Sequence, residues 1–304
     1  MEVLYFLESI RVPVVNELML MITKLGEETA FLVAAMVVFW CVDKRKGYYV
    51  MSVGFVGTML NQFLKLACRV PRPWVLDENF TILEQAREAA TGYSFPSGHS
   101  QSAVGTFGAI AHTTQVKWVK WLCIAVAVLV PFSRMYIGVH TPADVLTGAA
   151  ISLVLVLLMR KPAVDPKGSG MKYLIVGMLL MAIGLLAYTE LFPFPADVDA
   201  HNLQSGLKNA YTMIGCMAGI AVVYPAERRF VNFSPKAVWW VQVLKVMLGL
   251  ALVLLVKEGT RAPLEWIFVG HLAARSVRYF LIVITAGLLW PMCFSRFSRI
   301  GVKS

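Results

Sequence analysis

The sequence SRMYIGVHTPAD places Arg134, His140 and Asp144 between two long apolar runs. An unpaired ionised group there costs on the order of several kcal/mol. Thr141 and Pro142 predict a helix start, because threonine caps free N–H groups and proline suits the first helical position. Asp144 would then reach back to His140 and fix one ring tautomer, leaving the other nitrogen free to react. These residues alone allow a second interpretation, in which Asp144 only completes a capping box.

A second polar cluster contains Lys65 and Arg72 at the end of an apolar run. Basic residues at such ends commonly extend to the lipid headgroups. Here Pro71 and Pro73 flank Arg72, so they end the helix and fix the direction of the guanidinium. Headgroup contact does not require that restraint, and the cluster therefore also fits a binding site for an anion.

A third cluster, FPSGHS, precedes another apolar run. Ser97 is a candidate N-cap, and Gly98 permits close approach of the backbone. The free N–H groups of a helix start favour an anion, and His99 lies at the same place. This cluster combines anion-binding groups with a possible acid or base.

The composition requires a membrane protein. The 304 residues are 58% hydrophobic, with a mean hydropathy of +0.67. Runs of about 20 apolar residues can span a bilayer. The sequence predicts an all-α polytopic bundle of about nine spans, with eight to ten possible. The predicted spans are 28–42, 48–67, 98–113, 118–136, 142–159, 173–190, 209–224, 238–256 and 277–293.

With these spans, the three clusters fall on one side of the membrane. Unrelated basic residues have no reason to converge in this way. Arginine binds phosphate oxygens with two hydrogen bonds, and lysine supplies a point charge. The first turn of a helix supplies free backbone N–H donors. The sequence therefore predicts a phosphate site.

The three patterns Lys-x6-Arg-Pro, Pro-Ser-Gly-His and Ser-Arg-x5-His-x3-Asp together resemble the signature of the type 2 phosphatidic acid phosphatase (PAP2) superfamily. All three are complete and in the family's order, over roughly residues 60–150. The resemblance implies a PAP2-like helical core and a phosphatase that uses a phosphohistidine. Extra spans after the motifs are similar to those of glucose-6-phosphatases and sphingosine-phosphate phosphatases.

The resemblance also implies roles for individual residues. His140 would be the nucleophile, Asp144 would orient it, and His99 would protonate the leaving alkoxide and then activate water. The remaining motif residues would bind the phosphoryl group: Lys65, Arg72, Ser97, Gly98 and Arg134. Phosphoryl transfer needs mainly positioning and neutralisation of spread charge, which these residue types supply.

No cofactor or metal is expected. A two-metal phosphatase gathers several carboxylates, and Asp144 is the only carboxylate among the motif residues. The five cysteines have no paired spacing and are interpreted as packing residues. We therefore expect a metal-independent phosphoric ester hydrolase of the acid phosphatase type.

The charge distribution predicts the orientation. Alternating assignment of loops places 15 of the 28 basic residues opposite the motifs, with only Asp43, Asp165 and Glu227 as acids. Short basic loops remain in the cytoplasm, so the site should face away from it and the C-terminus should be cytoplasmic. The net charge of +10 is then a feature of topology, not of nucleic-acid binding. Both a cell membrane and the endoplasmic reticulum fit this interpretation.

The chain is predicted to consist of an amphipathic N-terminal segment (1–27), a catalytic core (28–160) and additional spans (161–304). The preferred substrate is a lipid phosphate monoester in the bilayer, of the phosphatidate or sphingoid-base type. Prenyl diphosphates and soluble sugar phosphates remain alternatives. So do a lipid phosphotransferase and a catalytically silent transporter or lipid-binding protein. The sequence does not predict the oligomeric state.

Overall fold

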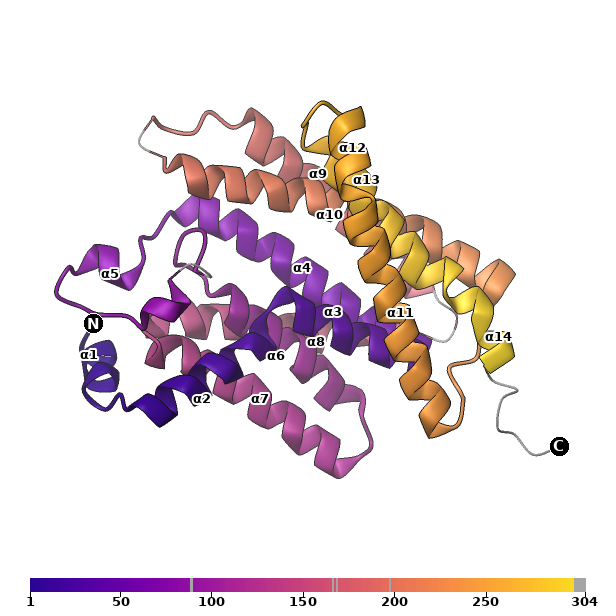
Figure 1. Ribbon diagram of the computed structural model, residues 1–304, viewed down its shortest axis with the longest axis horizontal. Helices are drawn as coiled ribbons and strands as arrows, with labels where there is room; N and C mark the ends of the chain where they lie inside the picture. Colours follow the sequence, from indigo (N-terminus) through magenta and orange to yellow (C-terminus); the bar gives the residue numbers. More distant parts are fainter. Residues whose placement is uncertain (88–89, 166, 168, 197, 298–304) are drawn as a thin grey trace. The chain divides into compact units, whose positions relative to one another are not determined.

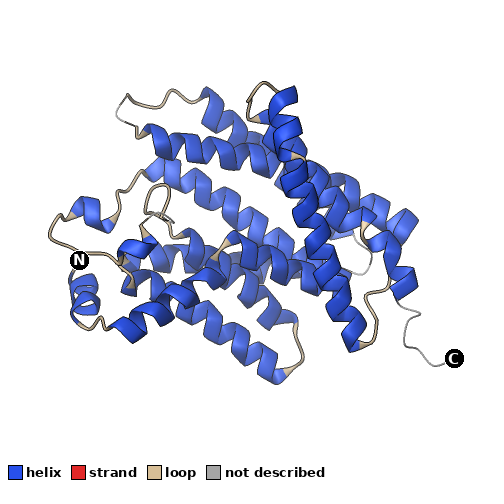
Figure 2. Ribbon diagram, viewed as in Figure 1, coloured by secondary structure: helices blue, strands red, loops and turns tan. Residues whose placement is uncertain are grey.

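The computed structural model describes residues 1–87, 90–165, 167, 169–196 and 198–297. Helices and short helical turns make up the regular structure of these residues, and no strand occurs among them (Figure 2). The all-α prediction is confirmed. The chain divides into two compact units, of which the first contains residues 1–32, 49–161 and 193–206, and the second contains the remainder.

The first unit holds the three motifs. It contains α1 (Glu2–Ser9), α2 (Pro13–Thr23), η1 (Lys24–Gly26), most of α4 (Lys44–Cys68), α5 (Pro73–Leu76), η3 (Glu84–Ala86), α6 (Gly98–Thr113), α7 (Lys117–Tyr136) and most of α8 (Pro142–Val164). Figure 1 shows α6 and α7 beside α8. The Ser152 hydroxyl of α8 donates to the Gln101 carbonyl of α6 over 2.7 Å, and the Tyr49 hydroxyl of α4 donates to the Val156 carbonyl of α8. These buried bonds hold together the helices that carry the motifs.

The second unit combines residues 33–48 with most of the chain after residue 161. It contains η2 (Val38–Val42), α9 (Ser169–Leu191), most of α10 (Ala200–Ala226), η4 (Glu227–Val231), α11 (Trp239–Gly259), α12 (Arg261–Ile267), α13 (Ala273–Ile284), η5 (Thr285–Leu289), η6 (Pro291–Cys293) and α14 (Phe294–Phe297). Helix α3 (Glu28–Val37) crosses the division. The indoles of Trp40 and Trp290 donate to backbone carbonyls of Ala286 and Lys245, so aromatic side chains fasten these helices.

Seven helices of the described residues are long and apolar enough to cross a membrane. The bent pair Pro13–Gly26 and Glu28–Val42 makes an eighth if it forms one span. The remaining predicted span, 98–113, corresponds to α6, which has 16 residues. The predicted count of about nine is thus close to the observed arrangement, and the protein is an integral membrane protein.

Residues 1–27 form more than a surface segment. Leu4, Leu7 and Met19 of α1 and α2 are buried. The Arg11 side chain donates to the carbonyl of Tyr136, at the end of α7, over 3.0 Å. Gly138 in the following turn has φ +87°, and a Cβ there would lie 2.8 Å from Arg11 Nη2. The N-terminal helices therefore pack against the turn that carries the third motif.

Candidate active site

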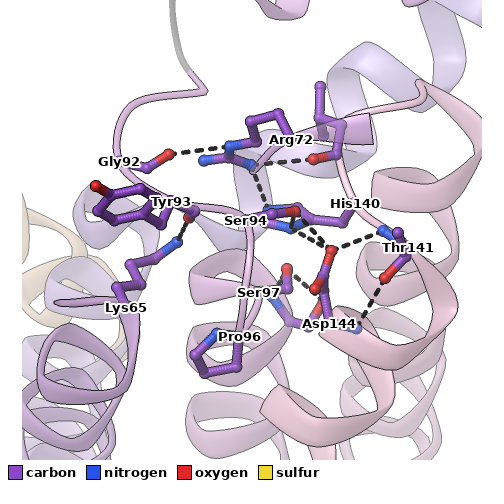
Figure 3. Close-up of polar contacts among 12 residues, drawn as sticks. Lys65, Arg72, Gly92, Tyr93, Ser94, Pro96, Ser97, His140, Thr141 and Asp144 are labelled. Carbon is purple, nitrogen blue, oxygen red and sulfur yellow. Dashed lines mark hydrogen bonds and ion pairs between the residues drawn. The ribbon is translucent and has the colours of Figure 1, made fainter. Parts of the chain in front are cut away.

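The turn between α7 and α8 folds as a reciprocal cap. The Asp144 amide donates to the Thr141 hydroxyl over 3.3 Å, and the Thr141 amide donates to Asp144 Oδ2 over 2.8 Å. Asp144 Oδ2 also lies 3.5 Å from His140 Nδ1. The two sequence interpretations are therefore compatible, because the same carboxylate caps the helix and faces the histidine (Figure 3).

The contacts of His140 define its tautomer. Arg72 Nη1 lies 2.9 Å from His140 Nε2, and a guanidinium can only donate hydrogen bonds. Nε2 must then be the acceptor, and Nδ1 carries the proton on the side of Asp144. Nε2 therefore holds the lone pair of the ring, and in this structure that lone pair accepts the hydrogen bond from Arg72.

Burial and nearby cations keep the His140 ring neutral. His140 lies in the turn between α7 and α8 and is only 2% exposed. Burial, reinforced by the nearby charges of Arg72, Arg134 and Lys65, holds the pKa of His140 well below its ordinary value. The ring is therefore neutral at neutral pH.

Arg72 and Lys65 are held by backbone carbonyls. Arg72 donates to the carbonyl of Gly92 over 3.1 Å, and Lys65 donates to that of Tyr93 (Figure 3). Arg72 also donates to the carbonyls of Thr91 and Val139 over 2.7 and 3.0 Å. Both side chains are over nine-tenths buried. Carbonyl groups orient a cation without cancelling its charge, so the part of the site around Arg72 and Lys65 keeps a net positive charge.

The second motif forms the start of α6. Ser97 is the N-cap; its hydroxyl accepts from the Ser100 amide over 3.4 Å, and its own amide donates to the backbone carbonyl of Asp144 over 2.9 Å. A Cβ at Gly148 would lie 2.6 Å from the Ser97 carbonyl. Glycine at position 148 therefore lets α8 approach the α6 start closely enough to join two of the motifs.

His99 and Arg134 lie near the N-terminal helices. Arg134 is 2% exposed and donates from Nη1 to the Thr23 hydroxyl over 2.8 Å, while its Nε has no hydrogen-bond partner in the described chain. A Cβ at Gly26 would lie 3.0 Å from His99 Cβ, so η1 packs against the first turn of α6. The cations Arg134, Arg72 and Lys65 all act electrostatically on the His99 ring.

Every residue predicted for the site from the sequence thus lies in the first unit: His140, Asp144, Lys65, Arg72, Ser97, Gly98, His99 and Arg134. Direct contacts join Arg72, His140 and Asp144, and the Ser97 amide bonds the Asp144 backbone. In the described residues, no group of three His, Cys, Asp or Glu side chains is arranged to hold a metal ion.

Ser94 is a site residue that sequence reasoning missed. It is fully buried, its hydroxyl donates to Asp144 Oδ2 over 2.6 Å, and the same oxygen lies 3.4 Å from His140 Nδ1. Thr23 was also missed as the partner of Arg134. Ser94 lies two residues before Pro96 in a loop, where no periodicity indicates the direction of a side chain. The close approach at Gly148 was weakly indicated by the sequence, since this glycine lies one helical turn after Asp144.

Comparisons with known proteins identify the family. The sequence model of the PAP2 superfamily matches residues 45–163, and that of the PAP2 superfamily phosphatase transmembrane extension matches residues 211–301. Phosphatidylglycerophosphatase B of Bacillus subtilis is 31% identical over 164 residues, which cover 50% of this chain and 76% of that protein. The chain belongs to the PAP2 superfamily.

Another PAP2 relative is an undecaprenyl-diphosphatase of Sulfolobus acidocaldarius, which is 31% identical over 45% of this chain and 66% of its own length. The crystal structure of a transmembrane PAP2 type phosphatidylglycerolphosphate phosphatase from Bacillus subtilis is 30% identical, covers 52% of this chain and 81% of that one, and has a TM-score of 0.44. As a PAP2 protein with membrane helices, the chain is a membrane phosphatase that hydrolyses phosphoric esters.

Proposed function

We propose that this PAP2 phosphatase hydrolyses a lipid phosphate monoester through a phosphohistidine on His140. The observation that carries the proposal is the order of contacts from Arg72 through His140 to Asp144. It gives Nδ1 of His140 a proton directed at a carboxylate and leaves Nε2 unprotonated, with a lone pair that becomes available when Arg72 binds the phosphoryl oxygens in its place. That arrangement suits in-line attack on a phosphoryl group.

The reaction then has two steps. His140 Nε2 forms a bond to phosphorus as the bond to the ester oxygen breaks, and His99 gives a proton to the departing alkoxide. Water, deprotonated by His99, next attacks phosphorus, and breakage of the N–P bond releases inorganic phosphate and neutral His140. The covalent intermediate replaces one difficult step by two easier ones.

Charge balance supports a phosphate as the substrate. Lys65, Arg72 and Arg134 are buried cations, and Asp144 is the only carboxylate among the proposed site residues. No ion pair links Asp144 to a cationic side chain in the described part of the chain, apart from its contact with His140. A phosphate dianion would offset the excess positive charge, with Ser97 and the Gly98 amide as additional donors.

The choice of a lipid monoester rests on the membrane setting. The motif residues follow or precede apolar helices, so a bilayer-anchored phosphate would be concentrated near them. The relatives are named for lipid phosphates and diphosphates. The loop from Trp74 to Phe95 is the proposed selector, because it supplies the carbonyls around Arg72. Within this loop, Glu84–Ala86 form a short helical turn.

The test is phosphate release by the purified protein in mixed micelles. The panel contains phosphatidate, a sphingoid-base phosphate, a prenyl diphosphate and glucose 6-phosphate, with His140→Ala as the matched blank. We expect the highest kcat/KM on a lipid monoester, inhibition by vanadate and no effect of chelators. Efficient hydrolysis of glucose 6-phosphate without activity on any lipid would refute the lipid preference. Transfer of phosphate to an added alcohol in place of release would favour a phosphotransferase.

We further propose that the site faces away from the cytoplasm and that residues 28–160 act as the catalytic core. The basis is the excess of basic residues in the loops opposite the motifs. Single cysteines placed at the exposed positions Asn79 and Arg45 should differ in labelling by an impermeant thiol reagent in intact cells. We expect labelling at position 79 and protection at position 45; the reverse pattern would invert the topology.

A further inference from the structure

The second unit contains a basic pocket to which the proposed reaction assigns no role. It has a volume of about 390 Å³ and lies within one unit, between the start of α10, the hairpin after α11 and the start of α13. Figure 1 shows α12 and α13 side by side. Four cations line the pocket with one acid and one histidine: Lys208, Arg261, Arg275, Arg278, Glu265 and His271. Its size is in the range of small-ligand sites.

The cations of this pocket are not neutralised by its single acid. Glu265 Oε1 is 3.3 Å from Arg261 Nε and is therefore already paired. Arg275 donates from Nε to the uncharged Thr212 hydroxyl over 3.2 Å. The side chains that line the pocket therefore carry about three more positive than negative charges, which favours binding of an anion.

Arg278 gives the most specific indication. Its side chain is only 8% exposed, and its Nε has no hydrogen-bond partner in the described residues. Arg275 and Arg278 are three residues apart in the first turns of α13. Like charges at this spacing repel each other, and a helix N-terminus disfavours cations. The Arg278 guanidinium lies 5.8 Å from the centroid of the Tyr279 ring, which offsets part of its charge, and its Nε remains available to a ligand.

His271 adds a hydrogen-bond donor. Its Nδ1 accepts from the Ala273 amide over 3.1 Å, so in the neutral ring Nε2 carries the proton. The neighbouring apolar residues are strongly exposed: Trp266 is 82%, Ile267 60% and Val269 92% exposed. Exposed tryptophan and aliphatic side chains beside cations are typical of a segment at the membrane interface.

From these contacts we propose that the pocket is a second anion site that binds the phosphate group of an anionic phospholipid. The guanidinium groups of Arg275 and Arg278 hold the phosphate oxygens, and the exposed apolar residues at the end of α12 and in the turn after it lie against the acyl chains. The site is independent of the hydrolytic reaction, because none of the motif residues takes part in it.

Native mass spectrometry of the purified full-length protein tests this inference. The probes are phosphatidylglycerol, phosphatidylcholine and inorganic phosphate, each titrated against the Arg72→Gln protein so that binding at the proposed active site is reduced. We expect one tightly bound phosphatidylglycerol and weak retention of phosphatidylcholine. Arg278→Gln and Arg275→Gln should each weaken phosphatidylglycerol binding by at least about tenfold, because each removes a charged hydrogen bond.

Lys257→Gln is the matched control, since it removes one positive charge near the end of α11 without lining the pocket. It should change the affinity less than twofold. Arg278→Lys should retain part of the binding and distinguish lost charge from lost packing. Unchanged phosphatidylglycerol binding in both glutamine variants, with thermal unfolding intact, would overturn the proposal. Binding of inorganic phosphate that equals that of the lipid would identify an anion site but overturn the lipid as its ligand.

Discussion

The Lys44–Glu227 ion pair and the cations of the candidate active site are neutralised differently. In the second unit, Lys44 lies 2.8 Å from Glu227, which is 1% exposed, so the charges cancel. In the first unit, Arg72 and Lys65 are held by backbone carbonyls, and Asp144 faces His140 and Ser94. The first arrangement fixes structure, whereas the second preserves a positive field. An unneutralised cluster is what a phosphoryl-transfer site requires.

Replacement of Arg72 should have the largest effect on catalysis. Arg72→Gln removes the donor to His140 Nε2, and kcat/KM should fall by about 10³-fold, as when a positioned charged donor is lost. Lys44→Gln is the control from the second unit, and it should leave kcat/KM within about twofold. Steady-state phosphate release measures both. An equal loss of activity in Arg72→Gln and Lys44→Gln would show that the two kinds of cation do not differ in their role.

Ser94 is predicted to be a positioning residue. Ser94→Ala removes the 2.6 Å hydrogen bond to Asp144 and should lower kcat by about 10-fold to 100-fold with little change in KM. Ser94→Thr keeps the hydroxyl and should restore much of the rate. A rise in KM at constant kcat would instead assign Ser94 to substrate binding.

Glu227→Gln should affect stability and leave the chemistry unchanged. It breaks the pair with Lys44, whose side chain is 21% exposed, so we expect a loss of about 2 kcal/mol and a lower Tm. Thermal unfolding in detergent measures the change, and kcat/KM well below the Tm should remain that of the unaltered protein. An unchanged Tm would show that the Lys44–Glu227 ion pair contributes nothing to the stability of the fold.

The smallest predicted effect is a shift in the pH dependence of kcat/KM. Because burial and nearby cations lower the pKa of His140, its neutral form persists into acid, and activity should be lost only as pH falls through that lowered value. After correction for ionisation of the substrate, the acid limb of kcat/KM should lie below about pH 6.5, the ordinary histidine value. An acid limb above that value would mean that His140 is not held neutral.

The sequence predicted the helical class, the membrane setting and the family, because these depend on hydrophobic runs and on spaced motifs. It also predicted the approach of Asp144 to His140, since one helical turn fixes that geometry. It could not predict Ser94 or the carbonyls around Arg72, because the path of the 77–97 loop depends on tertiary packing. The contact of Thr23 with Arg134 joins residues 111 apart, and no local pattern encodes it.

Trapping of the covalent intermediate tests the central claim most directly. The protein is incubated with a ³²P-labelled lipid monophosphate and quenched in alkali, where a phosphohistidine survives, and the labelled peptide is then identified. We predict label on His140, its accumulation in His99→Ala because the second step is slowed, and its absence in His140→Ala. Unlabelled protein that still turns over, or a His140→Ala variant that retains substantial activity, would contradict the mechanism.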